Sequence, residues 1–466
     1  MTQTELAYLS ITEASRGLRR KQFSPVELAQ ACLKRIESID GKLHSFITVT
    51  ADLALEQARK AEHELLAGTD KGPLHGIPIA LKDLYATEKI RTTCHSAVLQ
   101  DWMPDHDATA ASKLGEAGTV LLGKLAMHEF AFGGPSVDAP FPAVRNPWDT
   151  AHIPGGSSSG SGAALAAGLC LGSLGSDTGG SIRTPSSHCA VVGMKPTYGR
   201  VSRYGVVPLS WSLDHAGPMA RNVEDCAILL QAIAGDDPKD PASADVPVPD
   251  FRAELKNSIK GLRVGVPRAN WFGENKGTDP ETEVIFNTAL KTLEGLGAIV
   301  VDIDGRPFSL ARKANQTILV AEGYAYHEKR LREAPDKFGS SVRTRLLEGA
   351  FLSVADYITA LRTRTVLNEQ VCTNFSRVDV FGTPTASRPP DAFDTLDPNE
   401  QNLRPNFTNP FNLTGLPAIS LPCGFTKNAL PVGLQIIAPA FQENTAFRVA
   451  YAYEQATEWR ERRPKL

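Results

Sequence analysis

The sequence contains no long apolar run and no cluster of basic residues. Its 466 residues carry 49 Lys and Arg against 52 Asp and Glu, a formal net charge of −3. A helix that crosses a bilayer needs about 20 apolar residues, and even the apolar run at 163–171 is short and interrupted by glycine. Nucleic acids and anionic membranes attract basic surfaces. We therefore expect no nucleic-acid partner and no membrane partner, and a small molecule as the main ligand.

Paired cysteines and metal-binding motifs are also missing. The seven cysteines are scattered and contain no C-x-x-C pair, which predicts free thiols rather than a disulfide framework. None of the ten histidines belongs to an H-E-x-x-H motif, since His128-Glu129 is not followed by a second His at that spacing. We therefore expect no metal and no other cofactor. The first residues lack the basic leader and apolar core of a secretory signal, so the expected location is cytoplasmic.

Helical and strand-like segments alternate along the chain. With 42% hydrophobic residues, the sequence has enough apolar material for a large core. Short apolar runs at 76–81, 262–266 and 298–302 predict strands, and patterned runs at 108–118 and 281–296 predict helices. Such alternation is typical of parallel strands joined by helical crossovers. We therefore predict an α/β fold with a large mixed β-sheet core covered by helices on both faces.

Three further segments complete the predicted organisation. Ser24 to Glu27 forms a capping box with Pro at the first helical position, which predicts helices within an N-terminal segment of about residues 1–70. A smaller helical lobe is expected at about 305–370, and the Pro- and Asp-rich stretch 236–250 predicts a loop. No internal repeat is present, and we predict a single domain over 1–466.

The window 154–162 reads P-G-G-S-S-S-G-S-G and is the most unusual in the chain. Glycines let a backbone approach a ligand closely, and the small residues that follow predict a tightly packed helix rather than a linker. A phosphate-binding P-loop is excluded because Ser161, not Lys, follows the last glycine of G-x-x-x-x-G. The pattern G-x-S-x-G would make Ser158 the nucleophile of an α/β-hydrolase elbow. That hypothesis stays as an alternative, although no clear strand precedes the window.

A second glycine-rich window, at 174–185, reads L-G-S-D-T-G-G-S-I-R-T-P. Ser181 follows two glycines, where the consecutive backbone N–H groups of residues 178–181 can converge on one point. A tetrahedral oxyanion requires such donors, and each is typically worth about 3 kcal/mol in the transition state. A lysine at a strand end, Lys82, can act as the base if burial lowers its pKa from about 10.4 toward neutrality. The two windows and this lysine together predict a serine nucleophile activated without histidine.

These residues resemble the amidase signature family of serine hydrolases. The likeness covers most of the chain and rests on the two windows above and on the segments 76–83, 145–148, 193–202 and 409–418. In that family a Lys, a Ser that follows a cis peptide bond and a nucleophilic Ser form the catalytic set. Position by position, these correspond to Lys82, Ser157 and Ser181. The resemblance therefore implies the amidase signature fold and an enzyme that cleaves C–N amide bonds.

The mechanism that this resemblance implies is a proton relay. Neutral Lys82 draws a proton through Ser157 from Ser181, whose Oγ attacks the carbonyl carbon of the amide. Ser157 can relay the proton because a hydroxyl donates and accepts at once. The returning proton goes to the leaving amine, and water then releases the acyl-enzyme. The expected oxyanion hole consists of the backbone N–H groups of Thr178, Gly179, Gly180 and Ser181.

The resemblance also implies roles for residues around this set. Three residues are expected to support the nucleophile loop, with the last two forming an ion pair: Ser158, Asp177 and Arg183. The loop expected to border the substrate consists of Ala131, Phe132, Gly133 and Gly134.

The motifs indicate the type of reaction more clearly than they indicate the substrate. The likeness extends to the A subunit of the glutamyl-tRNA amidotransferase, which releases ammonia from glutamine for a partner protein. Such a subunit needs an Arg that binds the substrate carboxylate and a face that docks onto the partner. The run 321–327 does not resemble the corresponding sequence expected in that subunit. The sequence therefore favours a stand-alone hydrolase of a small aryl, alkyl or carbamate-type amide, with a homodimer as a further expectation. A catalytically inactive amidase-like binding protein is the alternative of another class.

Overall fold

A computed structural model of the chain describes residues 1–135, 138–269, 271, 277–396 and 406–466. Within these residues, eleven strands form one mixed sheet in the order β1-β3-β2-β4-β6-β5-β10-β11-β9-β7-β8. The strands are β1 Phe46–Val49, β2 Pro78–Lys82, β3 Val120–Leu125, β4 Gly172–Asp177, β5 Val192–Lys195, β6 His215–Ala220, β7 Arg263–Ala269, β8 Ile299–Asp304, β9 Val380–Pro384, β10 Ala418–Phe425 and β11 Pro431–Ile437. The predicted large mixed sheet is confirmed.

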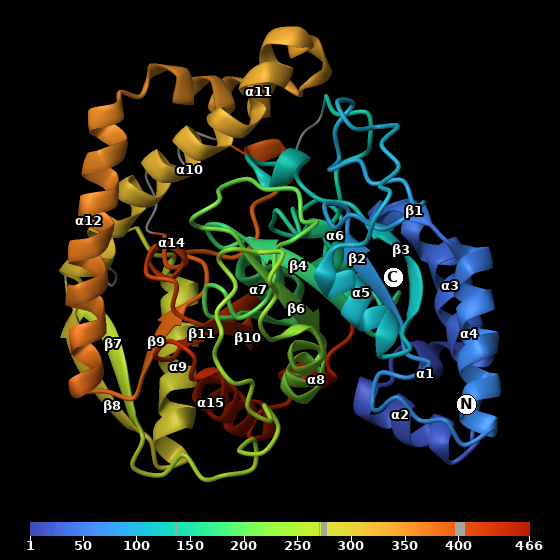
Figure 1. Cartoon of the computed structure of the whole chain (residues 1–466). Helices are drawn as coiled ribbons and strands as arrows, with labels where there is room; N and C mark the ends of the chain where they lie inside the picture. The colour runs from blue at the N-terminus through green and yellow to red at the C-terminus, as the bar shows by residue number, and fades with distance from the viewer. Residues whose placement is uncertain (136–137, 270, 272–276, 397–405) are drawn as a thin grey trace.

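Helices surround this sheet (Figure 1). The α-helices are α1 Gln3–Ala7, α2 Ile11–Arg19, α3 Pro25–Leu43, α4 Ala51–Leu66, α5 Thr109–Glu116, α6 Ser159–Ala166, α7 Arg183–Cys189, α8 Val223–Ile233, α9 Pro280–Gly295, α10 Arg306–Glu333, α11 Ser340–Leu347, α12 Val354–Thr373, α14 Asn409–Leu413 and α15 Glu443–Gln455. Short 3₁₀ turns are η1 Glu129–Ala131, η2 Pro335–Lys337, η3 Glu348–Phe351, η4 Asn374–Ser376, η5 Phe393–Thr395 and η6 Trp459–Glu461. No helix in the described ranges is both long enough and apolar enough to cross a membrane.

The helices cover both faces of the sheet, as two contacts at β10 and β11 illustrate. A Cβ on Gly433 would lie 2.7 Å from the side chain of Ser187 in α7, and a Cβ on Gly424 would lie 2.5 Å from that of Ile285 in α9. Gly424 is paired with Val432, the neighbour of Gly433. Because successive residues of a strand face opposite sides of a sheet, α7 and α9 lie on opposite faces.

The arrangement of β2 and β4 decides where two of the predicted site segments lie. These strands are parallel neighbours, with Leu81 paired to Leu174. Parallel strands bring their carboxyl ends to the same edge of the sheet. Lys82 ends β2, and Asp177 ends β4 directly before the glycines of the second glycine-rich window. The fold therefore places the lysine next to the loop that carries Ser181.

Helix α6 confirms the expectation of a tightly packed helix made of small residues. All of its residues are buried. A Cβ added to Gly160 would lie 2.5 Å from the backbone oxygens of Ala126 and Ser45. Such a contact is too short for any larger residue, so the glycine lets the helix lie directly against the end of β3 and the turn before β1.

The N-terminal segment and the segment at about 305–370 each contain several helices. The N-terminal segment contains helices α1 to α4, but it is not purely helical, because Phe46–Val49 forms the edge strand β1. The segment predicted as a helical lobe contains α10, α11 and α12, which lie together at one side of the molecule, opposite α3 and α4 (Figure 1). All seven cysteines are free thiols, as predicted.

Candidate active site

Lys82 is fully buried at the end of β2, and its Nζ contacts two hydroxyl groups. The Nζ atom lies 2.7 Å from the Oγ of Ser157 and 2.9 Å from the Oγ of Ser176. Burial lowers the pKa of Lys82 from 10.5 to about 7, although the carboxylates of Asp177 and Asp214 oppose this change. A substantial fraction of this amine is therefore uncharged near neutral pH and can accept a proton.

The loop that carries Ser157 is fixed by contacts on both sides. The Gly156–Ser157 peptide bond is cis. The carbonyl oxygen of Ser157 accepts a hydrogen bond from the backbone N–H of His128 at 3.0 Å. A Cβ on Gly156 would lie only 2.1 Å from the His128 ring, so no other residue fits at this position without a rearrangement. The hydroxyl of Ser157 is thereby held against Lys82.

Ser158 has a structural environment rather than that of a nucleophile. Its side chain is fully buried, and its Oγ bonds to the carbonyl oxygen and the backbone N–H of Ser176, each at 3.3 Å. Its backbone N–H donates to the carbonyl oxygen of Ser181 at 3.1 Å, which joins the two glycine-rich loops. The supporting role of Ser158 stays a prediction, and the elbow alternative, which needs an exposed Oγ at this residue, has no support in the geometry.

Ser181 lies in the loop between β4 and α7 and is partly exposed. Asp177 shapes this loop: its carboxylate accepts hydrogen bonds from the N–H groups of Gly180 at 2.7 Å and Ile182 at 3.1 Å. Arg183 donates to the same carboxylate through Nε at 2.9 Å and Nη2 at 2.8 Å. The expected ion pair is therefore present, and both partners are fully buried. Burial opposes ionisation, but the charge and hydrogen bonds of Arg183 outweigh it and lower the pKa of Asp177.

The expected oxyanion hole needs one correction. The N–H of Gly180 is already bonded to Asp177, so this residue shapes the loop and does not offer a free donor. Among the residues that the structure describes, the N–H groups of Thr178, Gly179 and Ser181 have no hydrogen-bond partner. The sequence could not reveal this difference, because it depends on which way each peptide turns around the carboxylate.

Thr178 is held from two directions. Its Oγ1 donates to Oδ1 of Asp214 at 2.6 Å, and its carbonyl oxygen accepts a hydrogen bond from Nδ2 of Asn315 in α10 at 3.4 Å. Burial raises the pKa of Asp214. These contacts fix the peptide of Thr178 at the mouth of the predicted oxyanion hole.

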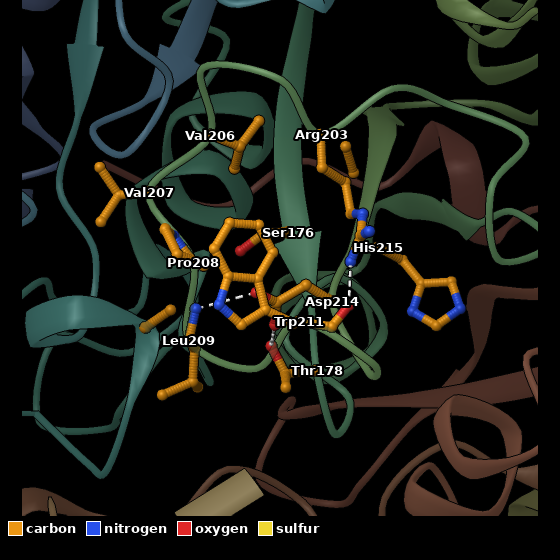
Figure 2. A pocket seen from close by; sticks show the side chains of 12 residues that line it. Ser176, Thr178, Arg203, Val206, Val207, Pro208, Leu209, Trp211, Asp214 and His215 are labelled. Carbon is orange, nitrogen blue, oxygen red and sulfur yellow. Dashed lines mark hydrogen bonds between the residues drawn. The ribbon is translucent and has the colours of Figure 1, made fainter. Parts of the chain in front are cut away.

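A small cavity of about 20 Å³ connects these residues with the predicted substrate loop (Figure 2). Ser176, Thr178 and Ala131 of the predicted substrate loop all line this cavity. Most of the other lining residues belong to the segment 206–214, which we call the pocket loop, and the rest are Arg203, His215 and Ala216. Trp211 of this loop is 60% exposed, and its ring stands over the cavity. Thr178 of the predicted oxyanion hole and Ala131 of the predicted substrate loop therefore border the same cavity.

The rest of the substrate loop lies between the catalytic loops and α11. The carbonyl oxygen of Gly133 is 2.9 Å from Nδ1 of His128, the residue whose backbone holds Ser157. The guanidinium of Arg345 lies over the ring of Phe132, 4.4 Å from its centroid. A Cβ added to Gly134 would have no atom within 4 Å, so there is open space beside this residue.

Sequence reasoning missed three polar residues near the catalytic set. Ser176 contacts Nζ of Lys82, Asp214 holds Thr178, and Glu322 of α10 binds the pocket loop through Ser210. Ser176 lies inside the second glycine-rich window, so its place one residue before the end of a strand could have marked it. Asp214 and Glu322 have no comparable signal in the sequence.

Comparison with known proteins identifies the class to which this architecture and this site belong. The family model described as Amidase matches residues 27–447. The chain therefore belongs to the amidase signature family and is an enzyme that acts on C–N amide bonds.

Several members of this family are similar over nearly the whole chain. The A subunit of glutamyl-tRNA(Gln) amidotransferase from Moorella thermoacetica is 45% identical over 489 residues, which cover 99% of both chains. Among solved structures, a chain from a vestigial protein complex linked to the origins of an s-triazine catabolic enzyme has a TM-score of 0.90 at 32% identity, covering 98% of this chain and 100% of that one. The A subunit of the amidotransferase from Thermotoga maritima has a TM-score of 0.78 at 36% identity, covering 98% and 94%.

Proposed function

We propose that this enzyme releases ammonia from the carboxamide of a substrate that also carries a carboxylate, with glutamine as the leading candidate. The sequence motifs alone favour a stand-alone hydrolase of small amides. The 45% identity to the Moorella amidotransferase protein over nearly the full length of both chains fits the alternative better. Because the name of that relative describes one subunit, the proposal includes a partner chain.

The contact between Lys82 and Ser157 carries the chemical part of this proposal. The buried amine, with a pKa of about 7, accepts a proton from Ser157, which in turn takes the proton of Ser181. The Oγ of Ser181 attacks the carboxamide carbon, and the N–H groups of Thr178, Gly179 and Ser181 stabilise the oxyanion. The proton then passes to the leaving nitrogen, ammonia departs, and water hydrolyses the acyl-enzyme.

Arg345 supports a carboxylate on the substrate. Its side chain is partly buried, and among the described residues no carboxylate forms an ion pair with it. Burial lowers the pKa of Arg345; the charge of Glu348 opposes this change, and that of Arg312 adds to it. A guanidinium in such a place gains most from a planar anion that binds it through two hydrogen bonds. The substrate loop, through Phe132, lies directly against this group.

The proposal is tested with a panel of amides and the purified chain. Ammonia release is measured from glutamine, from butyramide, which lacks both charged groups, and from an aryl anilide, with Ser181→Ala as the control. We expect kcat/KM for glutamine to exceed that for butyramide by about tenfold or more, as one well-placed ion pair in a partly buried site provides. Equal values for the two amides would contradict the proposal.

A small neutral amide remains the second candidate, because the sequence motifs alone favour a stand-alone hydrolase of such amides. Turnover of butyramide or the anilide without turnover of glutamine would favour this candidate. A fluorophosphonate probe separates both from the binding-protein hypothesis. Mass mapping should find the label on Ser181, and an unlabelled protein would favour an inactive scaffold. The homodimer stays a prediction that sedimentation velocity measures.

A further inference from the structure

We propose that Glu322 of α10 is a positioning residue for catalysis, which holds the peptide of Thr178 in the oxyanion hole through the pocket loop. This inference rests on the proposed role of the Thr178 N–H. It concerns a group that does not touch the substrate but acts through Ser210 and Asp214.

The carboxylate of Glu322 is the meeting point of four hydrogen bonds. Its Oε2 accepts from the Oγ of Ser210 at 2.5 Å and from the N–H of Ser212 at 3.0 Å. Its Oε1 accepts from the Oγ of Ser212 at 2.8 Å and from the hydroxyl of Tyr357 in α12 at 2.8 Å. A carboxylate with four donors has a fixed orientation, and no neutral side chain of this size can accept all four.

The pocket loop transmits this constraint to Thr178. Asp214 accepts hydrogen bonds through Oδ2 from the N–H groups of Leu209 at 2.8 Å and Ser210 at 3.0 Å. Its other oxygen accepts from Oγ1 of Thr178 at 2.6 Å. In Figure 2, the bonds from Leu209 and from Thr178 meet at Asp214, next to Trp211. Ser210 thus joins the two carboxylates, with its Oγ on Glu322 and its N–H on Asp214.

Helix α10 also reaches Thr178 directly. Asn315 lies seven residues before Glu322, which is about two helical turns, so the two side chains lie on the same side of α10. The Nδ2 of Asn315 donates to the carbonyl oxygen of Thr178. A Cβ on Gly323 would lie 3.4 Å from Leu209, which shows how closely the helix backbone approaches the pocket loop. Helix α10 therefore holds Thr178 in two ways. Asn315 bonds directly to the carbonyl oxygen of Thr178, and Glu322 acts on the Thr178 side chain indirectly, through the pocket loop.

The consequence concerns the transition state more than the bound substrate. The N–H of Thr178 must point at the place where the oxyanion forms, and a displacement of about 1 Å in such a group can cost about 100-fold in rate. The substrate carbonyl carries little charge before attack, so ground-state binding depends far less on this donor. Loss of the Glu322 network is therefore expected to lower kcat while KM stays nearly constant.

The test compares Glu322→Gln with Tyr357→Phe, which removes a single donor, and with the control Glu328→Gln. Glu328 lies on the same helix, and its main partner is the exposed Arg332 at 2.6 Å. Fluorophosphonate titration of Ser181 gives the concentration of active sites, and kcat and KM are then expressed per active site for any amide that the enzyme cleaves. Affinity for a boronic acid, which forms a tetrahedral adduct on the serine, is measured in parallel.

We expect kcat per active site to fall about 10- to 100-fold in Glu322→Gln and less in Tyr357→Phe, with the boronic acid weakened by a similar factor and KM changed by less than about twofold. Glu328→Gln should match the wild type. If Glu322→Gln lowers only the fraction of titratable sites or the melting temperature, with unchanged kcat per site, Glu322 is merely structural and the inference is wrong. If Glu322→Gln does not fold, Tyr357→Phe decides by the same criterion. Turnover retained by Ser181→Ala would instead overturn the proposed function itself, whatever Glu322 does.

Discussion

The Nζ of Lys82 lies 2.7 Å from the Oγ of Ser157, and both side chains are shielded from solvent. A charged ammonium would be poorly solvated here, since Asp177 is already engaged by Arg183 and the nearest partners of Nζ are hydroxyl groups. The amine therefore releases its proton more readily than a lysine in water. This relationship underlies the predictions that concern the base.

Replacing the proposed nucleophile should abolish turnover and leave the fold intact. Ser181 is partly exposed in a loop whose shape depends on Asp177 and not on the Ser181 hydroxyl. We expect Ser181→Ala to lose at least about 10³-fold in kcat, the scale of removing a catalytic nucleophile, with an unchanged circular dichroism spectrum. A variant that keeps its activity would show that another residue attacks the amide.

The pH dependence of the reaction should report the titration of Lys82. With a pKa of about 7, the uncharged amine becomes more abundant as pH rises. We therefore expect kcat/KM to rise through about pH 7 and to level off above it. Lys82→Arg should be nearly inactive, because a guanidinium keeps its proton. A profile that rises only above about pH 10 would mean that Lys82 is an ordinary charged lysine.

The same burial should make Lys82 costly for stability. In the unfolded chain its pKa returns to 10.5, so between about pH 7 and pH 10.5 the unfolded state binds the extra proton and the free energy of unfolding rises with pH. The difference between the two pKa values corresponds to at most about 5 kcal/mol, reduced by about 1 kcal/mol for each lost hydrogen bond.

Urea denaturation of Lys82→Met tests this cost. The variant should be more stable than the wild type at pH 7.5, and the gain should shrink as the pH approaches about 10.5. Lys60→Met, at an exposed position on α4, is the matched control and should show no such pH dependence. A Lys82→Met protein less stable than the wild type throughout this range would contradict the assignment of a buried uncharged amine.

Ser176 should matter because it orients the base. Its Oγ occupies one of the two polar contacts of Nζ, which directs the lone pair of the amine toward Ser157. We expect Ser176→Ala to lower kcat about tenfold, a part of what general-base catalysis contributes. Ser173→Ala is the control in the same strand, since Ser173 bonds to Ser161 away from Lys82. Equal kinetics of the two variants would show that Ser176 has no role in orienting the amine.

The strands could be predicted from the sequence only where they contain a run of apolar residues. The apolar runs at 262–266 and 298–302 correspond to β7 and β8, and the run at 76–81 corresponds to β2. Strand β4 reads G-S-L-G-S-D and β6 reads H-A-G-P-M-A, so neither shows a β-branched run nor an alternating pattern. These two strands lie in the middle of the sheet, where burial by neighbours on both sides decides their conformation, and no local propensity reveals it.

The candidate site also has a part that the sequence reveals and a part that only the tertiary structure reveals. Lys82, Ser157 and Ser181 belong to motifs that can be read from the sequence, and the structure brings the lysine against Ser157. The hydrogen bond from the Gly180 N–H to the carboxylate of Asp177 depends on how the peptide is oriented, which the sequence does not show. The link from Glu322 to Ser210 joins residues 112 positions apart and arises only when α10 packs against the pocket loop. Such contacts are properties of the tertiary structure and not of a local pattern.

Arg345 should distinguish substrates that carry a carboxylate from those that do not. Its guanidinium lies over Phe132 of the substrate loop and forms no ion pair with a described carboxylate, although the charge of Glu348 acts on it from a longer distance. We expect Arg345→Met to raise KM for glutamine by about 10- to 100-fold, the scale of one charge-assisted bidentate contact. The kinetic constants for butyramide should change by less than about twofold. Arg343→Met, on the same helix but paired with the exposed Asp336, should behave as the wild type with both amides. A parallel loss for glutamine and butyramide in Arg345→Met would assign this arginine to the shape of the loop, and the carboxylate part of the proposed function would then be wrong.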